Sequence, residues 1–468
     1  MCYRKSDEST TLYFPSSCES LLYSLMDIRQ SEIMEYLPKH PDNQKGHLKR
    51  VLGTFDVICM GFNCVVGAGI FLIVGQVQSL AGNGVFLVFP LCGLLCFFIA
   101  LCFAEMAGIY GKTGGAYLYA RDVFGPLIGF WVGWIMWISS IIGWASVASG
   151  FGFYVRYFLP EEQAWCSMLI VATSIAGLGS VNYFGIKLGA KVINFFTVGK
   201  LFSLLMFVGI GMFFVKKGNF TSLHRIENFN TAIIIALYAY TGFEFIGVPA
   251  GEMRNPQRDI PRILVFVFLI VTLFYATIQI VATGTFPGLA TSEKPLADAA
   301  KYFLGPVGGL IIGIGALLSI GGSSAGIALT SPRSLYVLSK GGFFPELFSK
   351  IHPRYHTPHV AILVNTGLTL FLSITGSFKY LIAASVMVSI LQYIPTCLAV
   401  IVLRKKRPDV KRTFMVSGGY CIPFFALVIC CWLVYHVELK VIAATVFVIV
   451  VSLPLYFYKR TVVNQIET

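Results

Sequence analysis

Two glycines around one alanine, Gly67-Ala68-Gly69, interrupt the first long apolar stretch of the sequence. Glycine disfavours the interior of a helix, so this pattern predicts a helix that breaks and leaves backbone N–H and C=O groups free. In the hydrocarbon of a membrane, such groups persist only where protein or a cavity satisfies them. A broken helix at mid-membrane depth is typical of the binding site of a transporter.

The two sides of this break present different chemistry. The N–H groups of Gly69, Ile70 and Phe71 begin the second half-helix, whose positive dipole end attracts an anion such as a carboxylate. The carbonyls around Val65 and Val66 end the first half-helix and accept from an ammonium group. The break thus offers both poles that an α-amino acid needs. The alternative is close packing of helices through small residues.

A second glycine-interrupted stretch, Thr241-Gly242-Phe243-Glu244, lies much later in the chain. Glu244 is an acid in an apolar stretch, and carboxylates inside a membrane are costly enough to indicate function. The alternative is a neutral Glu244 that hydrogen-bonds between helices. Three aromatic residues near the glycine are candidates to close over a bound ligand: Tyr238, Tyr240 and Phe243.

Other apolar stretches contain further polar positions. Lys200 lies about seven residues, or roughly 10 Å, into a helix expected to begin near Ile193. It either extends to the cytoplasmic interface or faces the bundle interior, where loss of water favours release of its proton. A protonated amine there would tether spans 1 and 8 as a bound cation does. Ser323 and Ser324 either contact an ammonium or ion, or serve helix packing.

Three predicted cytoplasmic loops are rich in glycine, proline and charge, namely residues 111–117, 254–261 and 331–333. Their arginines have acidic candidates to pair with: Glu105, Asp122 and Glu252. Such pairs would form an inner gate. Exposed ion pairs contribute little individually, so ordinary loop roles are the alternative.

The composition requires a membrane around most of the chain. Of 468 residues, 56% are hydrophobic and 12% are charged, against about 25% charged in soluble domains. Roughly twelve segments come near the ~20 apolar residues that cross a bilayer, which predicts an all-α polytopic membrane protein. They lie at about 51–74, 85–107, 124–158, 166–184, 193–214, 231–248, 263–286, 307–329, 360–374, 380–403, 420–435 and 441–458.

Basic residues are divided unequally between the two sides of these spans. With the N-terminus inside, the cytoplasmic loops hold most lysines and arginines, so the positive-inside rule predicts that both termini are cytoplasmic. The net charge of +13 is therefore a signal of topology and gives no support to nucleic-acid binding. We expect a multi-pass protein of the plasma or inner membrane, in contact with the lipid bilayer.

The two glycine-interrupted stretches lie five predicted spans apart, in spans 1 and 6. A repeat of five crossings must enter the membrane from the opposite side, so we expect 5+5 inverted repeats whose breaks meet near the midplane. The predicted organisation is a cytoplasmic tail (1–50), a ten-helix transport core (51–403), and two accessory helices with a short cytoplasmic C-terminus (404–468). Residues 21–37 of the tail form either an amphipathic surface helix or an unstructured segment.

The sequence lacks the P-loop and H-E-x-x-H motifs of soluble enzymes. We therefore expect no enzyme activity and no cofactor. His352, His356 and His359 cluster beside prolines, which favours a loop over a metal site, and no metal is expected. The cysteines are interpreted as small buried hydrophobic residues.

Five motifs resemble those of the amino acid–polyamine–organocation family of permeases, over about residues 48–460. The motifs are Gly67-Ala68-Gly69-Ile70-Phe71 and residues 112–117, 242–244, 252–261 and 331–333. The chain is most similar to the cationic amino acid transporter branch and related bacterial permeases. The resemblance implies the leucine-transporter fold, in which spans 1, 2, 6 and 7 rock against the rest to give alternating access.

The resemblance also implies residue roles. The implied substrate site comprises the amides of Ala68, Gly69 and Ile70, the carbonyls of Val65, Tyr238 and Thr241, and the neighbouring Gly67 and Phe243. Tyr238 matches an aromatic gate, and Lys200 matches a lysine that replaces a sodium ion in proton-coupled members. Many relatives have Ser or Thr in place of Ala68, a difference that keeps the amides but affects selectivity.

These residues together predict a secondary active transporter of α-amino acids that works by proton symport. Lys200 and Glu244 are the predicted proton-coupling groups, and Ser323 and Ser324 the predicted contacts at the ion position. One alternative is an exchanger of amino acids or polyamines. The other is a membrane sensor that binds an amino acid without transporting it.

Overall fold

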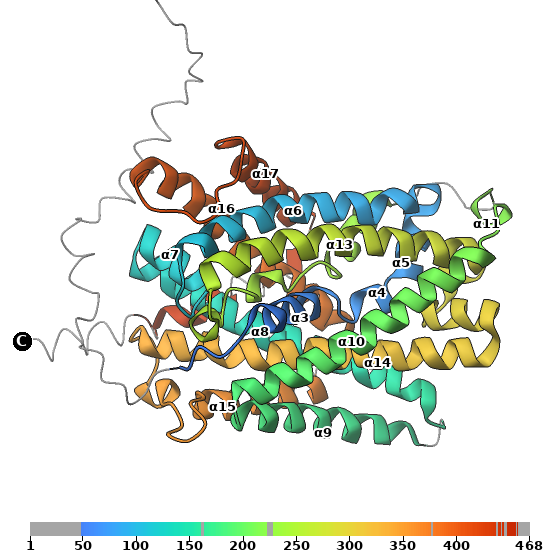
Figure 1. Cartoon of the computed structure of the whole chain (residues 1–468), viewed down its shortest axis with the longest axis horizontal. Helices are drawn as coiled ribbons and strands as arrows, with labels where there is room; N and C mark the ends of the chain where they lie inside the picture. Colours follow the sequence, from blue (N-terminus) through green and yellow to red (C-terminus); the bar gives the residue numbers. More distant parts are fainter. Residues whose placement is uncertain are drawn as a thin grey trace, which may run out of the picture. The chain divides into compact units, whose positions relative to one another are not determined.

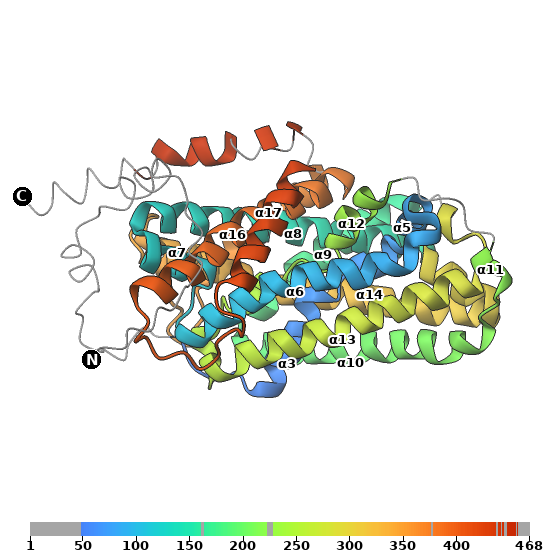
Figure 2. The same cartoon turned by 90° about the horizontal axis from the view of Figure 1, so that it is seen from above.

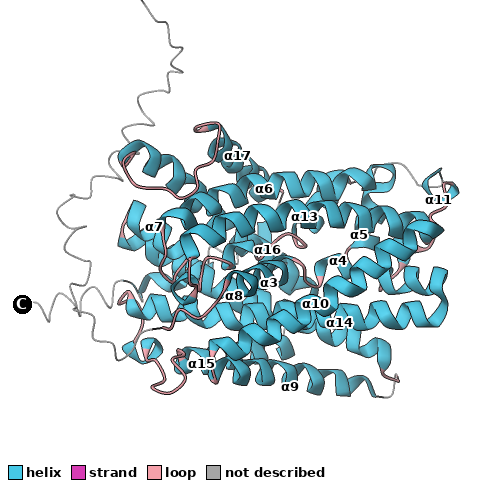
Figure 3. Ribbon diagram, in the orientation of Figure 1, coloured by secondary structure: helices cyan, strands magenta, loops and turns pink. Residues whose placement is uncertain are grey.

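The computed structural model describes residues 48–456, apart from 161–162, 222–227, 376–377, 437–438, 441, 444–446 and 455. These residues form helices and connecting segments and contain no β-strand (Figure 3). The predicted surface helix at residues 21–37 lies outside the described residues, as does part of the last predicted span.

The main helices follow one another without any large inserted segment. They are α3 (Thr54–Val65), α4 (Gly69–Leu72), α5 (Val74–Ala81), α6 (Val85–Ile109), α7 (Ala116–Phe124), α8 (Pro126–Val155), α9 (Ala164–Tyr183), α10 (Ile186–Gly211), α11 (Gly218–Thr221), α12 (Phe229–Leu237), α13 (Pro256–Thr285), α14 (Pro295–Lys340), α15 (His359–Thr375), α16 (Phe378–Lys406) and α17 (Cys421–Tyr435). Short 3₁₀ turns connect several of them; two of these, Phe243–Phe245 and Ala250–Glu252, fall between α12 and α13.

Eight helical segments among the described residues are long and apolar enough to cross a membrane, and α15 and α17 are shorter apolar helices. The predicted all-α, multi-pass membrane class is therefore confirmed, while the count of twelve spans stays a prediction. The eight segments are Thr54–Leu72, Val74–Ile109, Pro126–Val155, Trp165–Tyr183, Ile186–Phe214, Pro256–Thr285, Pro295–Lys340 and Ala384–Lys406.

Long helices surround the short ones that carry the first glycine motif. α6 lies along α13, and α10 lies along α14 (Figures 1 and 2). α8 packs against both α14 and α16, and α3 contacts α10, α13 and α14. The helix that ends in the first break is thus enclosed by protein, which is the setting that irregular backbone requires in a membrane.

Three predicted boundaries are wrong. The helix expected from near Ile193 begins at Ile186, because Gly185 ends the preceding turn with φ of 139°. Residues 331–333 lie inside α14, which continues through Pro332, and most of residues 254–261 belong to α13, where Pro256 occupies the first turn. Arg333 is buried and paired although its surroundings have the composition of a loop, so the sequence pattern ends α14 too early. The pattern also begins α10 and α13 too late, because polar residues occupy their first turns.

Candidate functional site

The first break separates α3 from α4. α3 ends at Val65, the next residue is extended with φ −82° and ψ 96°, and α4 begins at Gly69. The Phe71 N–H donates to the Ala68 carbonyl at 3.1 Å, so the expectation that this group is free is wrong, because it closes the first turn of α4. The N–H groups of Ala68, Gly69 and Ile70 have no acceptor among the described residues.

The carbonyl groups at this break are surrounded by side-chain donors. The Lys200 amine donates to the Val66 carbonyl, and the Ser319 hydroxyl lies 3.4 Å from the same oxygen. The Ser323 hydroxyl lies 3.2 Å from it and 2.7 Å from the Asn63 carbonyl. Lys200 is fully buried, roughly 21 Å along α10 from its first residue, so the alternative in which it extends to the membrane interface is wrong.

The second break begins where α12 ends, at Leu237, and α-helix resumes only at Pro256. Gly242 has φ of 108°, a conformation that strains any residue with a side chain. The Glu244 Oε2 accepts from the Gly242 N–H at 2.9 Å and from the Tyr393 hydroxyl at 3.0 Å. Glu244 Oε1 is buried and has no hydrogen-bond partner among the described residues.

The two breaks touch. A Cβ on Gly69 would lie 2.7 Å from the Cα of Ala239, and a Cβ on Gly242 would lie 2.1 Å from the Cys64 carbonyl oxygen. Only glycine permits this approach. The Tyr275 hydroxyl on α13 lies 3.3 Å from the Val65 carbonyl and 3.2 Å from the Ala239 carbonyl, so one phenol bridges both broken helices.

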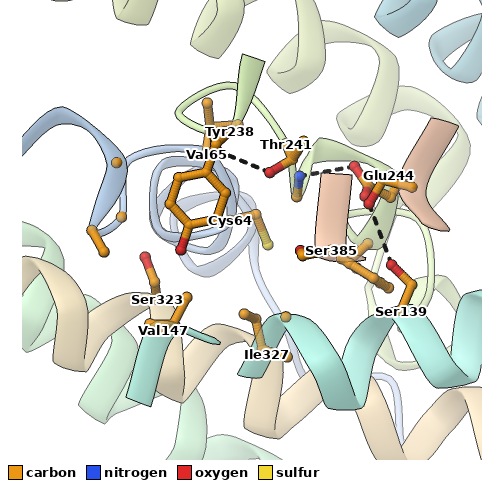
Figure 4. Close-up of a pocket in the computed structure, with 17 residues that line it drawn as sticks. Cys64, Val65, Ser139, Val147, Tyr238, Thr241, Glu244, Ser323, Ile327 and Ser385 are labelled. Atoms are coloured by element: carbon orange, nitrogen blue, oxygen red, sulfur yellow. Dashed lines mark hydrogen bonds between the residues drawn. The ribbon is translucent and has the colours of Figure 1, made fainter. Parts of the chain in front are cut away.

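A cavity of about 50 Å³ lies where the breaks meet (Figure 4). Eight of the predicted site residues line it: Val65, Gly67, Ala68, Gly69, Tyr238, Thr241, Glu244 and Ser323. The Tyr238 ring extends across the cavity toward Val147 and Ser323 in Figure 4, and its hydroxyl lies 3.2 Å from that of Ser146. The structure thus gathers groups from both glycine motifs around one space.

Four predicted site residues do not line this cavity: Ile70, Phe243, Lys200 and Ser324. Phe243 stacks instead on Tyr393, with ring centroids 5.2 Å apart. Tyr240 points away from the cavity and donates to the Phe89 carbonyl at 2.9 Å, so the expectation that it closes over a ligand is wrong. Its hydroxyl needs a buried acceptor, and α6 supplies one.

The sequence is similar to those of known proteins over most of its length. Residues 52–458 match the amino acid permease family. The chain belongs to this family. The permease is 27% identical to the branched-chain amino acid permease of Bacillus subtilis (strain 168) over 449 residues, which cover 89% of the chain and 95% of that protein.

Two other relatives are named as an exchanger and a transporter of different amino acids. The serine/threonine exchanger of Bacillus subtilis (strain 168) is 28% identical, over 81% of the permease and 89% of the exchanger. The cystine/glutamate transporter of Homo sapiens is 30% identical, over 80% of the permease and 78% of that protein. The predicted family is confirmed, and it is a family of transporters and not of enzymes.

The acidic residues expected to pair with arginines do so in the permease. Arg333 on α14 donates from Nε to Glu252 Oε2 at 2.9 Å and from Nη2 to Oε1 at 3.0 Å, and both side chains are fully buried. Because a buried charge without its partner is strongly unfavourable, this pair fixes the end of the second break against α14.

A second group of ion pairs joins α6 and α7 to the end of α16. Arg404 pairs with the buried Glu105 and also donates to the Val416 carbonyl at 2.9 Å. Asp122 accepts from the partly exposed Arg407 and from the Tyr110 hydroxyl. Burial and the hydrogen bond to Asp122 raise the pKa of Tyr110 well above its usual range. These pairs confirm the predicted partners, and the gate role stays a prediction.

The sequence does not single out part of the lining. The missed residues are mainly small: Cys64, Ser139, Gly143, Val147, Ser385 and Ser389. Ser385 and Ser389 lie four apart in one helix, which places them on one face. This spacing is a visible signal, but serines in membrane helices also serve packing, so the pattern alone does not identify a cavity.

Proposed function

We propose that this permease is a secondary active transporter that moves α-amino acids by alternating access, coupled to protons. The observation that carries this proposal is the cavity between the two breaks, which has unpaired N–H groups on one side and backbone carbonyls on the other. An α-amino acid, whose ammonium and carboxylate groups are attached to the same carbon, matches these two poles.

The substrate carboxylate binds the amides of Ala68, Gly69 and Ile70 in this proposal, since those donors have no acceptor among the described residues. The substrate ammonium binds the carbonyls of Val65, Tyr238 and Thr241. Each carbonyl has two lone pairs, so the bond that Val65 accepts from Tyr275 leaves room for a second donor.

Proton coupling is assigned to Lys200, with Glu244 as a second carrier. A charged Lys200 amine holds the Val66 carbonyl, together with Ser319 and Ser323, and ties the first break to α10 and α14. Loss of its proton weakens that tie and accompanies the inward transition. The proton thus acts where a metal cation would otherwise hold these carbonyls.

The proposed architecture is a leucine-transporter-like core of 5+5 inverted repeats within about twelve helices. The core spans residues 51–403, with accessory helices beyond it, and both termini face the cytoplasm of a plasma or inner membrane. The buried pair of Glu252 and Arg333 then belongs to the inner gate, because it joins span 6 to span 8.

The test is uptake of a panel of radiolabelled amino acids by proteoliposomes, with and without a pH gradient that is acidic outside. We expect the gradient to raise uptake of at least one α-amino acid, and Lys200→Ala to abolish that increase. Lys191→Ala is the matched control, since Lys191 is an exposed residue of the same helix. Gradient-driven uptake that survives Lys200→Ala contradicts the role of Lys200.

The same vesicles distinguish the alternatives. An obligate exchanger takes up substrate only when amino acid is present inside, and the serine/threonine exchanger among the relatives makes this outcome worth measuring. Uptake into empty vesicles supports symport. Binding without any flux would instead indicate a sensor.

A further inference from the structure

The cavity has a hydroxyl-rich side. Ser139 and Ser389 lie with their hydroxyl oxygens 3.3 Å apart, and Ser385 and Glu244 line the same region. Figure 4 shows Ser139, Ser385 and Glu244 gathered on the side away from Ser323. Because the amides and carbonyls that fit the backbone of an amino acid lie at the breaks, this polar side is where a substrate side chain would lie.

Two polar groups on this side have no hydrogen-bond partner among the described residues. Glu244 Oε1 is buried and has no hydrogen-bond partner among the described residues, although Oε2 accepts two hydrogen bonds. Ser385 is 6% exposed, and its hydroxyl likewise has no protein partner within the described part of the chain. A buried polar group without a partner is unfavourable, so Glu244 Oε1 gains when a ligand supplies a donor. The Ser385 hydroxyl lines the same cavity and is available to the same ligand group.

The remaining walls limit the size of that ligand. Val147 and Ile327 are apolar walls, and the cavity volume of about 50 Å³ is far below the ~300–1,000 Å³ of pockets for drug-sized ligands. A Cβ on Gly143 would lie 3.7 Å from the Ser385 hydroxyl, so one methyl group already fills the space there. The small volume favours a small side chain over a long cationic or aromatic one.

We propose that the permease selects α-amino acids with a small hydroxyl-bearing side chain, as in serine and threonine. The inference rests on the proposed function, and it adds the substrate class. The substrate hydroxyl donates to Glu244 Oε1 and accepts from Ser385, which satisfies both unpartnered groups at once. A methyl group in its place leaves them unpaired, and this difference is the source of the selectivity.

The experiment measures competition against radiolabelled L-serine uptake in proteoliposomes, with L-alanine, L-2-aminobutyrate, L-threonine, L-leucine and L-arginine as competitors. We expect serine and threonine to compete about tenfold better than alanine and 2-aminobutyrate, which lack only the hydroxyl. Leucine and arginine should not compete. In Ser385→Ala, the preference for serine over alanine, measured as the ratio of the two uptake rates in the same vesicles, should fall close to one.

Two further variants separate an effect on the cavity from a general effect of substitution. Gly143→Ala should weaken threonine more than serine, because its new methyl group occupies the side-chain space. Ser174→Ala on α9, whose hydroxyl bonds within its own helix at 2.7 Å, should change neither ratio. Equal competition by alanine and serine, or strong competition by arginine, overturns the hydroxyl preference and leaves amino acid transport intact. Failure of every amino acid to enter or compete overturns the proposed function itself.

Discussion

The two helix breaks differ in the groups that hydrogen-bond and hold their irregular backbone. The first, between α3 and α4, is short. Its Val66 carbonyl accepts hydrogen bonds from the Lys200 amine and two serine hydroxyls. The second extends from Tyr238 to Asn255 and is held by carboxylates, with Glu244 on the Gly242 N–H and Glu252 on Arg333. One break is stabilised by donors from neighbouring helices, and the other largely by its own acids.

This difference assigns separate tasks to the breaks. The first leaves N–H groups without an acceptor in the described part of the chain, which suits recognition of a carboxylate common to all amino acids. The second positions side chains such as Tyr238 and Glu244 around the cavity, which suits recognition of the rest of the substrate. Substitutions at the second break should therefore be more informative about selectivity.

The largest effect is expected at the glycine of the second break. Gly242→Ala combines φ of 108° with a Cβ 2.1 Å from the Cys64 carbonyl, and neither can relax without separating the breaks. We expect substrate affinity to fall at least ~100-fold, or the protein to fail to fold. The new Cβ of Gly67→Ala at the first break meets only the Ser323 side chain, with the hydroxyl oxygen at 2.8 Å and the Cβ at 3.4 Å, so the loss of affinity should be smaller.

Binding to purified protein and its thermal unfolding measure both variants. Gly177→Ala is the matched control, because a Cβ there meets nothing within 4 Å. Equal losses of substrate affinity and thermal stability in Gly67→Ala and Gly242→Ala would contradict the expectation that Gly242 is the more sensitive position.

The next largest effect is expected where the second break is anchored. Arg333→Met leaves Glu252 buried without its partner, which should lower the free energy of unfolding by about 3–5 kcal/mol. Arg407→Met should cost less than about 1 kcal/mol, because the side chains of Arg407 and Asp122 are 48% and 35% exposed. Thermal and chemical unfolding in detergent measure the two changes. A stable Arg333→Met protein with an unchanged midpoint would show that this anchor is dispensable.

A smaller effect than that of Arg333→Met is expected at the residue that joins the breaks. Tyr275→Phe keeps the buried ring but removes the hydroxyl between the Val65 and Ala239 carbonyls. The stability loss should be about 1 kcal/mol, with a few-fold loss of substrate affinity, because one hydrogen bond is removed and the packing is kept. Titration of binding and the unfolding midpoint measure it. A larger loss of affinity than in Gly67→Ala would make the bridge, and not the first break, the main determinant of binding.

Much of the site follows from local sequence. Gly67, Gly69 and Gly242 mark both breaks, because glycine in an apolar helix is informative wherever it appears. The sequence also indicates Glu105, Asp122 and Glu252 as ion-pair partners, because charges in a membrane protein rarely remain unpaired. Lys200 was identified as unusual, but the sequence placed it too near the start of its helix to decide between the interface and the interior.

Other features depend on contacts between distant segments. Ser139 and Ser385 enter the cavity from α8 and α16, and Tyr275 reaches both breaks from α13. Arg333 has the sequence context of a loop, yet it is fully buried because Glu252 lies opposite it. The serines and the tyrosine do not differ in type from residues that merely pack.

The sequence by itself determined that the chain crosses a membrane, that two of its helices are broken, and which charged residues are unusual there. Composition and glycine placement act locally, so they can be interpreted without the fold. Only the tertiary structure decided that the two breaks touch, that Lys200 ends at the Val66 carbonyl, and that serines from separate helices share one cavity with Glu244. Those facts depend on how helices pack, and packing is set by many side chains at once.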